Sequence, residues 1–484
     1  MNRSVSRIAG LAILIAALSV LGSSCATNPV TGRQELMLLS RDQEIDLGKA
    51  TDPEIVREYG RYPDAELDAY VTALGSKLGA ASHQPDLEYT VKVLDSPVVN
   101  AFAVPGGYVY LTRGILAYLN DEAELAGVMA HEVGHIAARH SAQQQSRAQL
   151  AQLGLAVGSV LSPTLAQVAE LAQIGLGMLF LGFSRDNERQ ADDLGGLYSS
   201  KIGYDAHKMA NLFVTLGRLN PESGQDGLPA WFSTHPNPPD RIAAIRKAAD
   251  EWQKANPQVK VVTNREQFLK NIEGIVVGED PRRGYVEAQV FYHPDLRFQF
   301  PVPAGWVVNN TASQVQVFTE KQDAVMLLSI AAEATPAAAA DAFVSGAAAV
   351  VLDSQAVRVQ GLSAQRIACD VNTEQGVLRA LAYFIQKDQR VYAFLAYTAQ
   401  AAFDGYYGNF EQSLSGFRNL TDAARINVKP ARLALRRTQA QGSLRQVLLS
   451  LGVPQDKLEA YAILNGMNLE DPVAANTLVK VTVR

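Results

Sequence analysis

The sequence predicts a multidomain protein in which a mainly α domain with a small edge sheet precedes an α+β domain and a small C-terminal αβ unit. Three observations predict this order. Apolar residues around His131 follow the periodicity of a buried helix, strand-like runs mix with an alanine-rich helix from about Gln289 to Phe417, and the last residues run helix, turn and strand. With 484 residues, 48% of them hydrophobic, the chain can bury more than one core.

Changes in composition divide the chain into five expected segments. They are a signal peptide at 1–24, a lipidated tether and N-terminal segment at 25–40, the mainly α domain at 41–275, the α+β domain at 285–422 and the C-terminal unit at 428–484.

The first residues have the pattern of a secretory signal. Two arginines precede the apolar run Ile8 to Leu21, which is too short to span a membrane, and small residues then lead to Cys25. Cys25 resembles the lipidated cysteine of a bacterial lipoprotein, although Leu21 and Gly22 sit one place earlier than in the usual lipobox. We expect a periplasm-facing lipoprotein of the bacterial outer membrane; the alternative is ordinary cleavage and a soluble periplasmic protein.

The strongest local signal is the run HEVGH from His131 to His135. Two imidazoles four residues apart lie on one face of a helix, and the glutamate between them can take a proton from a metal-bound water. Asn120 or Asp121 can cap this helix, and its apolar residues predict that it packs into a core. The pattern predicts a zinc hydrolase site that needs a third protein ligand.

Two kinds of third ligand are compatible with this helix. One is a histidine ten residues after the first, but Ser141 stands there and His140 misses the position by one, so we expect His140 to be a solvated residue near the helix end. The other is a glutamate on a second helix. Glu188 fits this role, and Asp192, four residues later on the same face, can accept the free ring N–H of a histidine ligand.

Several strings between about Thr27 and Ala248 strengthen this interpretation. They are Asn28 to Gly32, Asn100 to Gly107, the HEVGH helix, Glu188 with Asp192, and Thr234 to Pro236. With them the sequence resembles the M48 family of zinc metallopeptidases, in its periplasmic lipoprotein subgroup. The resemblance implies a zincin-type peptidase domain of the gluzincin kind, in which His131, His135 and Glu188 bind one Zn²⁺ per chain and Glu132 is the general base.

Such a site leaves a fourth position at the metal for water, and the oxyanion that develops during attack on a peptide carbonyl needs a second stabiliser. His235, in a stiff proline-rich run, is the catalytic candidate for that donor. Alternatively, His235 occupies the open zinc position when no substrate is present and acts as an inhibitory gate. Arg241 pairs with Asp192 or begins the next helix as a surface charge.

The resemblance also points to a substrate-binding strand. Asn100 to Val104 predicts a short strand that ends in a Pro-Gly-Gly turn before a second strand, Tyr108 to Leu111. In the family the first of these is an edge strand that pairs with an extended substrate. We therefore expect substrate contacts at Asn100, Ala101 and Phe102; without the resemblance the segment is an ordinary hairpin.

Three further segments carry weaker signals. Leu150 to Phe183 predicts a hairpin of buried or half-exposed helices; the alternatives are a membrane span and a lid or membrane-facing patch beside the active site. The α+β domain combines a helix from Ala337 to Val351 with several strands and shows no catalytic constellation, so a binding or positioning module is expected. Ser443 to Arg484 faintly resembles a LysM-type peptidoglycan-binding unit. The expected strands are Leu296 to Phe300, Val315 to Phe318, Val325 to Ile330 and Val391 to Tyr397.

Together these features predict a zinc endopeptidase of the bacterial cell envelope that hydrolyses unfolded, misfolded or misassembled envelope proteins. Its expected partners are these substrates, the membrane through a lipid anchor at Cys25, and peptidoglycan through the C-terminal unit. A net charge of −6 without basic, aromatic-rich runs argues against nucleic acid. The alternative is a chaperone-like or cell-wall-binding scaffold that retains the peptidase fold with little proteolysis.

Overall fold

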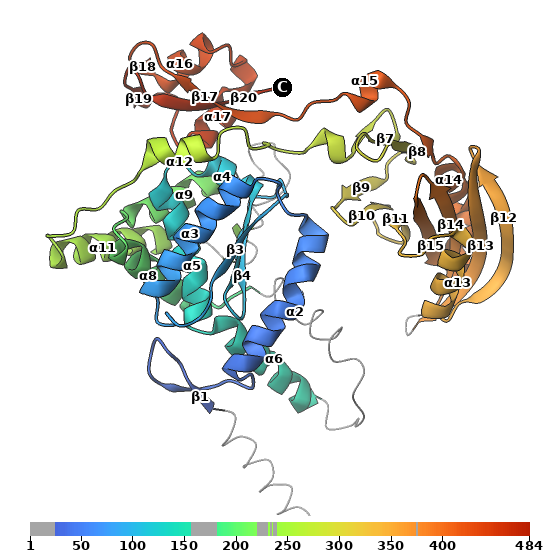
Figure 1. Cartoon of the computed structure of the whole chain (residues 1–484), viewed down its shortest axis with the longest axis horizontal. Helices are drawn as coiled ribbons and strands as arrows, with labels where there is room; N and C mark the ends of the chain where they lie inside the picture. Colours follow the sequence, from blue (N-terminus) through green and yellow to red (C-terminus); the bar gives the residue numbers. More distant parts are fainter. Residues whose placement is uncertain (1–24, 156–181, 220–230, 233–234, 236–239, 374–375) are drawn as a thin grey trace, which may run out of the picture. The chain divides into compact units, whose positions relative to one another are not determined.

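A computed structural model of the chain describes residues 25–155, 182–219, 231–232, 235, 240–373 and 376–484 (Figure 1). The chain forms two compact units. The first unit combines the described parts of Met1–Val56 with Arg61–Gly278 and Arg432–Val483, and the second contains Arg57–Gly60 and Glu279–Ala431. The expected signal peptide and most of the apolar segment 150–183 lie outside the described residues. Within the described ranges, no helix is both long and apolar enough to cross a bilayer.

The first unit is mainly helical, as predicted, and carries a small mixed sheet. In the sheet order β3-β5-β4, β3 runs parallel to β5 and β4 runs antiparallel to it, so β4 is an edge strand. The elements before the active-site helix are β1 Cys25–Thr27, β2 Gln34–Leu36, α2 Arg41–Tyr59, α3 Ala65–Ala81, β3 Thr90–Leu94, β4 Ala101–Val104, β5 Tyr108–Thr112 and α4 Arg113–Tyr118. Those that follow are α5 Glu122–Ala137, α6 His140–Leu155, α8 Arg185–Lys201, α9 His207–Gly217, α11 Asp240–Ala255 and α12 Arg265–Asn271.

Helix α5 lies at the centre of this unit, and all of its residues are buried. Asp121 is its N-cap, because the Asp121 side chain accepts a hydrogen bond from the Glu124 backbone N–H at 2.9 Å. Glu124 in turn accepts from the Asn120 N–H at 2.6 Å. Gly134 lets α8 approach closely, since a Cβ at that position would lie 3.2 Å from the Ala191 carbonyl oxygen. The apolar residues that produce the sequence periodicity therefore bury the HEVGH segment inside a close-packed core.

The second unit is rich in strands. A seven-stranded antiparallel sheet has the order β12-β13-β14-β15-β11-β10-β9, and a four-stranded sheet has the order β16-β8-β7-β6. The strands are β6 Tyr285–Glu287, β7 Val290–His293, β8 Phe298–Pro301, β9 Val307–Asn310, β10 Gln314–Phe318, β11 Ala324–Ile330, β12 Val350–Val359, β13 Leu362–Thr373, β14 Gly376–Lys387, β15 Arg390–Ala399 and β16 Arg418–Asn419, and the helices are α13 Pro336–Gly346, α14 Phe403–Ser415 and α15 Ala423–Ile426.

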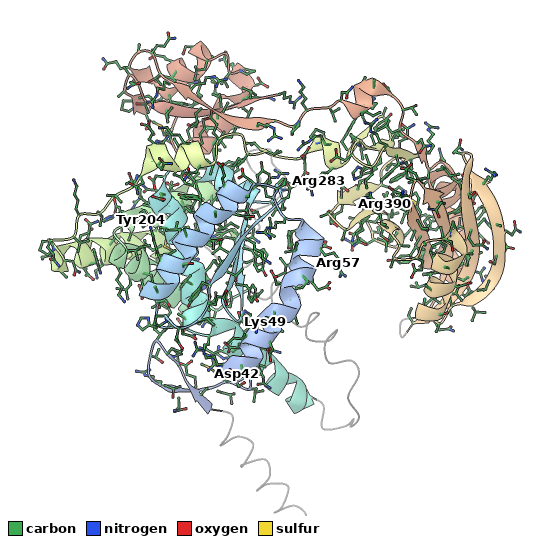
Figure 2. All side chains as sticks on the ribbon, viewed as in Figure 1. Asp42, Lys49, Arg57, Tyr204, Arg283 and Arg390 are labelled. Carbon is green, nitrogen blue, oxygen red and sulfur yellow. The ribbon has the colours of Figure 1, made fainter. Side chains whose placement is uncertain are left out.

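Alternation along β14 explains how the long sheet is covered. Leu381 and Ile385 belong to a core that includes Phe410 of α14, whereas Ala382 and Phe384 belong to another core that includes Ala339 of α13. Because neighbouring residues of a strand point to opposite faces, α13 and α14 cover opposite faces of this sheet. The four predicted strands and the predicted alanine-rich helix of this unit are present, with shifted ends. Figure 2 shows the side chains on these elements.

The predicted helix Ala337 to Val351 is wrong at its C-terminal end. Helix α13 stops at Gly346, and Ala348 has a left-handed backbone with φ of 47°. Val350 and Val351 instead begin strand β12, where they pair with Asp370 and Cys369 of β13. The alanine-rich composition predicts helix throughout this segment, because only the β-branched Val350 and Val351 favour a strand.

The C-terminal residues pack into the first unit. Leu433, Ile463 and Leu464 share its core, and the fully buried Lys480 donates hydrogen bonds to the carbonyls of Ala117 and Leu119, each at 2.8 Å. Strands β17 and β20 pair antiparallel around two helices, so the expected helix, turn and strand are preceded by a strand that was not predicted. The elements are β17 Arg432–Arg437, β18 Gly442–Ser443, α16 Leu444–Ser450, α17 Leu458–Leu464, β19 Pro472–Val473 and β20 Leu478–Val483.

Candidate metallopeptidase site

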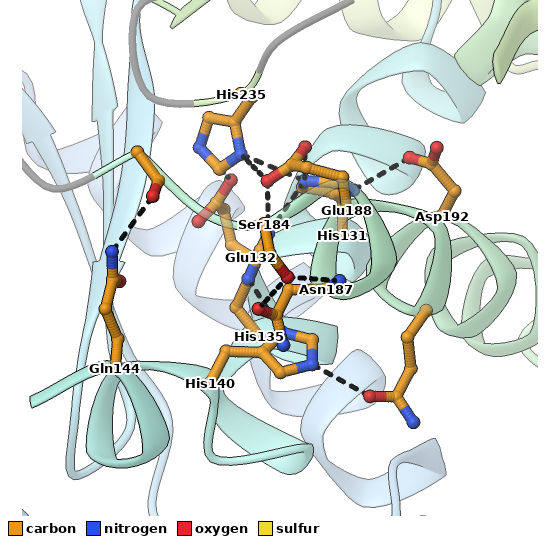
Figure 3. A network of polar contacts seen from close by, with 12 residues as sticks. His131, Glu132, His135, His140, Gln144, Ser184, Asn187, Glu188, Asp192 and His235 are labelled. Atoms are coloured by element: carbon orange, nitrogen blue, oxygen red, sulfur yellow. Dashed lines mark hydrogen bonds and ion pairs between the residues drawn. The ribbon is translucent and has the colours of Figure 1, made fainter. Parts of the chain in front are cut away.

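Two helices bring three of the predicted ligands together (Figure 3). His131 and His135 project from α5, and their Nε2 atoms lie 3.0 Å apart. Glu188, on the first turn of α8, places one carboxylate oxygen 3.5 Å from Nε2 of His135 and the other 3.7 Å from Nε2 of His131. All three side chains are buried.

The residues present fit a zinc ion. One ligand atom from each of His131, His135, Glu188 and His235 lies within 4.8 Å of the other three. Two imidazoles and a carboxylate are the usual donor set of a catalytic zinc site, in which a fourth position stays open. The close approach of ring nitrogens from His131 and His135 is also what a shared cation between them would require.

Glu132 points toward the same cluster and has no other task. Neither carboxylate oxygen accepts a hydrogen bond from the residues that the structure describes, although both are buried. Oε1 lies 3.6 Å from Nε2 of His235. Burial raises the pKa of the Glu132 carboxyl above its ordinary value, and the neighbouring His235 and His131 oppose this rise. A buried carboxylate at a candidate metal cluster, with a raised pKa, is suited to receive a proton from water.

Asp192 and Arg241 support His131 from behind. Oδ1 of Asp192 lies 3.1 Å from Nδ1 of His131. The Arg241 guanidinium is buried and donates to both oxygens of Asp192 at 2.7 Å, while its third nitrogen lies 2.9 Å from Glu188. Of the two alternatives for Arg241, the structure therefore contains the pairing with Asp192. Burial works against ionisation of Asp192, yet the hydrogen bonds from Arg241 and His131 lower the pKa of Asp192 below its usual value.

His235 lies inside the ligand cluster. Its Nδ1 is 3.0 Å from Oε1 of Glu188 and 3.3 Å from Nε2 of His131. The ring stacks on Trp231 with centroids 4.3 Å apart, and the His235 backbone N–H donates to the Trp231 carbonyl. Burial lowers the pKa of His235, but the neighbouring Glu188 and Glu132 carboxylates outweigh burial and raise it overall. This geometry places the His235 ring among the side chains that would hold a metal ion.

The predicted substrate strand is an edge strand next to the active-site helix. Strand β4 pairs with β5, from Ala101 opposite Leu111 to Val104 opposite Tyr108. Ala101 and Phe102 are buried, so contacts with a substrate on this strand would come from its backbone. The Asn100 side-chain oxygen is buried without a hydrogen-bond partner among the described residues.

His140 is the residue that sequence reasoning missed, because the expected solvated position is wrong. It is buried, its Nδ1 lies 2.9 Å from Nδ1 of His135, and its Nε2 lies 2.8 Å from Oε1 of Gln190. On one continuous helix, a residue five positions after His135 would face away from it. The chain reverses at Arg139, with φ of 58°, and no proline or glycine marks that turn in the sequence.

An HExxH helix, a glutamate from a second helix and an edge strand beside them define a metallopeptidase domain of the zincin kind. Residues 65–249 match the model of peptidase family M48, and this domain belongs to that family. The family predicted from the sequence is thereby confirmed.

Curated relatives extend the comparison. The chain is 31% identical over 247 residues to a putative beta-barrel assembly-enhancing protease of Vibrio cholerae, covering 49% of this chain and 51% of the relative. It is 33% identical over 233 residues to mitochondrial metalloendopeptidase OMA1 of Schizosaccharomyces pombe, covering 46% and 65%. The chain therefore matches about half to two thirds of the length of these relatives. Among solved structures, cyanobacterial PsbP of Synechocystis matches 27% of this chain and 91% of its own, with 18% identity and a TM-score of 0.24.

Proposed function

We propose that this protein is a zinc-dependent endopeptidase of the bacterial cell envelope. One observation carries the proposal: His131, His135 and Glu188 converge from two helices, with the buried carboxylate of Glu132 beside them. The names of the relatives, a beta-barrel assembly-enhancing protease and a metalloendopeptidase, support the same class of activity.

The roles of the side chains follow from their positions. Zinc, when bound, supplies an activated water and polarises the scissile carbonyl. Glu132 accepts the proton of the attacking water and passes it to the leaving amine. Asp192, fixed by Arg241, holds His131 with Nδ1 outward so that Nε2 faces the cluster. The backbone of β4 holds an extended substrate, which gives affinity with modest sequence preference.

We assign His235 to the gate of the site. Its Nδ1 lies among the ligand atoms, and in that position it competes with water and substrate. The alternative role of the same ring is to donate a hydrogen bond to the oxyanion that forms when the peptide carbonyl is attacked.

Casein cleavage by the wild type and by Glu132→Gln tests the proposed activity. The wild type is expected to cut casein, and Glu132→Gln to retain zinc while cleavage falls by at least about a hundredfold. If the wild type binds zinc and both proteins leave casein intact, the scaffold function replaces the peptidase function.

The gate is tested by His235→Ala. A gate predicts faster cleavage of small, poorly competing peptides with zinc retained. Slower cleavage with zinc retained would leave only the oxyanion role, and loss of the metal would make His235 an obligatory ligand.

The cellular setting is proposed from the sequence. The pattern that ends at Cys25 supports lipidation and attachment to the outer membrane on its periplasmic side, where misassembled envelope proteins are the substrates. The β17-α16-α17-β20 order is compatible with a LysM-like unit, so we include peptidoglycan contact. Fractionation of wild type against Cys25→Ala, and cosedimentation with purified peptidoglycan, test these two attachments separately.

A further inference from the structure

A buried chain of polar contacts runs outward from His135 (Figure 3). Nδ1 of His135 lies 2.9 Å from Nδ1 of His140, and Nε2 of His140 lies 2.8 Å from Oε1 of Gln190 on α8. His135 and His140 are 2% and 1% exposed, so water does not replace the contact between the two rings. Both ring nitrogens of His140 are therefore placed against a specific polar partner.

The acceptor at Gln190 determines where the protons lie along this series of contacts. The Gln190 Oε1 atom is an acceptor, so Nε2 of a neutral His140 carries the proton and its Nδ1 carries the lone pair. Nδ1 of His135 must then be the donor of the N···N contact. A neutral His135 with its proton on Nδ1 has its lone pair on Nε2, which is the atom that faces His131 and Glu188.

The backbone holds His140 in this place at a cost. Arg139 adopts a left-handed conformation with φ of 58°, which L-residues other than glycine rarely adopt. The Arg139 guanidinium donates to Glu44 at 2.9 Å and to the Leu39 carbonyl at 2.8 Å, and these contacts secure the turn. The turn ends α5 at Ala137 and returns the chain so that α6 begins with His140 beneath His135.

We propose that His140 is a positioning residue for the metal ligand His135. By accepting the His135 Nδ1–H, it fixes the tautomer and ring orientation that direct Nε2 to the metal, as Asp192 does for His131. The inference rests on the proposed zinc site. It adds that the two histidine ligands have different partners: the neutral His140 accepts from His135, and the charged Asp192 accepts from His131. Outer partners of this kind commonly change metal affinity 10–100-fold.

A matched pair of variants separates positioning from space filling. His140→Asn retains an acceptor near the place of Nδ1, whereas His140→Leu has a similar size and no acceptor. Zinc affinity of the intact chain is measured by competition with a chromophoric chelator, and the visible spectrum is recorded with Co²⁺ in place of zinc. We expect His140→Leu to weaken zinc binding about 10–100-fold and to shift the Co²⁺ spectrum, and His140→Asn to stay within about threefold of wild type.

Zinc affinity and the Co²⁺ spectrum of these variants decide whether His140 positions His135 or only fills space. Equal zinc affinity and an unchanged Co²⁺ spectrum in His140→Leu would overturn the inference, as would equal weakening in both variants. If His140→Leu does not fold, judged by circular dichroism, the comparison moves to His140→Gln, which places its polar end near Nε2 and is expected to weaken binding more than His140→Asn. Absence of zinc from the wild type would instead contradict the proposed function.

Discussion

Each buried carboxylate at the site is distinguished by its partners. Glu132 accepts no hydrogen bond by distance and angle from the described residues and has the His235 ring 3.6 Å away, Glu188 faces three imidazoles and Arg241, and Asp192 is held by two guanidinium nitrogens. From these surroundings we propose different tasks for three identical chemical groups: a proton acceptor, a metal ligand and a support. Arg241 is the residue common to the last two.

Arg241→Met leaves Glu188 and Asp192 in a buried site without their cation. We expect the free energy of unfolding to fall by about 3–5 kcal/mol, because uncompensated buried charge is expensive. Arg189→Met is the control, since Arg189 pairs with Asp240 at an exposed position and its loss should cost only about 0–1 kcal/mol. Urea unfolding of both variants in the presence of a chelator measures the free energies of unfolding. Equal losses in the two variants would contradict the expected cost of leaving buried charge unpaired.

At the scale of elements, the contact between α5 and α8 sets the distances between Glu188 and the two histidines of the HEVGH segment. A Cβ on Gly195 would lie 3.1 Å from the backbone nitrogen of His131 and 3.2 Å from its Cα. Gly196, the next residue of the same helix, has open space around such an atom. The glycine at 195 therefore lets Glu188 and His131 stay within reach of one ion.

Gly195→Ala and Gly196→Ala exploit this contrast. Gly196→Ala should stabilise the protein by roughly 0.5–1 kcal/mol through helix propensity. Gly195→Ala should instead destabilise it by about 1–3 kcal/mol and weaken zinc binding, since α8 must move away from α5. Urea unfolding and zinc titration check both effects, and a stabilised Gly195→Ala with normal zinc binding would rule out close packing as the cause.

The contact between α9 and α11 should depend on pH. Burial lowers the pKa of His207 at the start of α9, but hydrogen bonds to Asp205 and to Asp250 of α11 outweigh burial and raise it above 6.5. A raised folded-state pKa gives stability that is complete below the unfolded pKa and is lost as the pH rises through the folded pKa.

His207→Gln should therefore be less stable than wild type near about pH 5.5 and equally stable near about pH 9. The difference should stay below about 1 kcal/mol, because His207 is partly exposed and its partner Asp250 is largely exposed, so solvent screens the interaction. Paired denaturant titrations at the two pH values measure it. A difference that grows with pH would have the wrong sign for this account.

At the scale of the whole molecule, the strand-rich unit is an insertion into the first unit. The Leu433 backbone N–H donates to Ile275, and the Gly274 N–H donates to Leu433, so the chain leaves and re-enters the first unit at neighbouring points. Residues after the insertion complete the core around α5.

This topology predicts opposite outcomes for two deletions. Replacement of residues 279–431 by a short flexible linker should leave a folded first unit that still cuts casein. Truncation after Ala431 should abolish folding, because it removes buried Leu433, Ile463 and Leu464 together with Lys480. Circular dichroism and casein cleavage compare the two; a folded, active truncation would contradict the shared core.

Local signals in the sequence were enough to predict α5, the β4–β5 hairpin and four strands of the second unit, β8, β10, β11 and β15. Asp121 is a residue type that favours a helix N-cap. Alternation of apolar and polar side chains predicts strands with one buried face. The return of residues 432–483 to the first unit could not be predicted, because it depends on pairing between residues more than a hundred positions apart. The reversal at Arg139 was missed for a related reason: a distant ion pair to Glu44 stabilises it, rather than a local turn residue.

Zinc content of the purified chain after dialysis tests the central claim most directly. The account predicts about one zinc atom per chain in the wild type and in Glu132→Gln, and nearly none in Glu188→Ala. A wild type without zinc, or a Glu188→Ala protein that keeps the metal as tightly as the wild type, would contradict it.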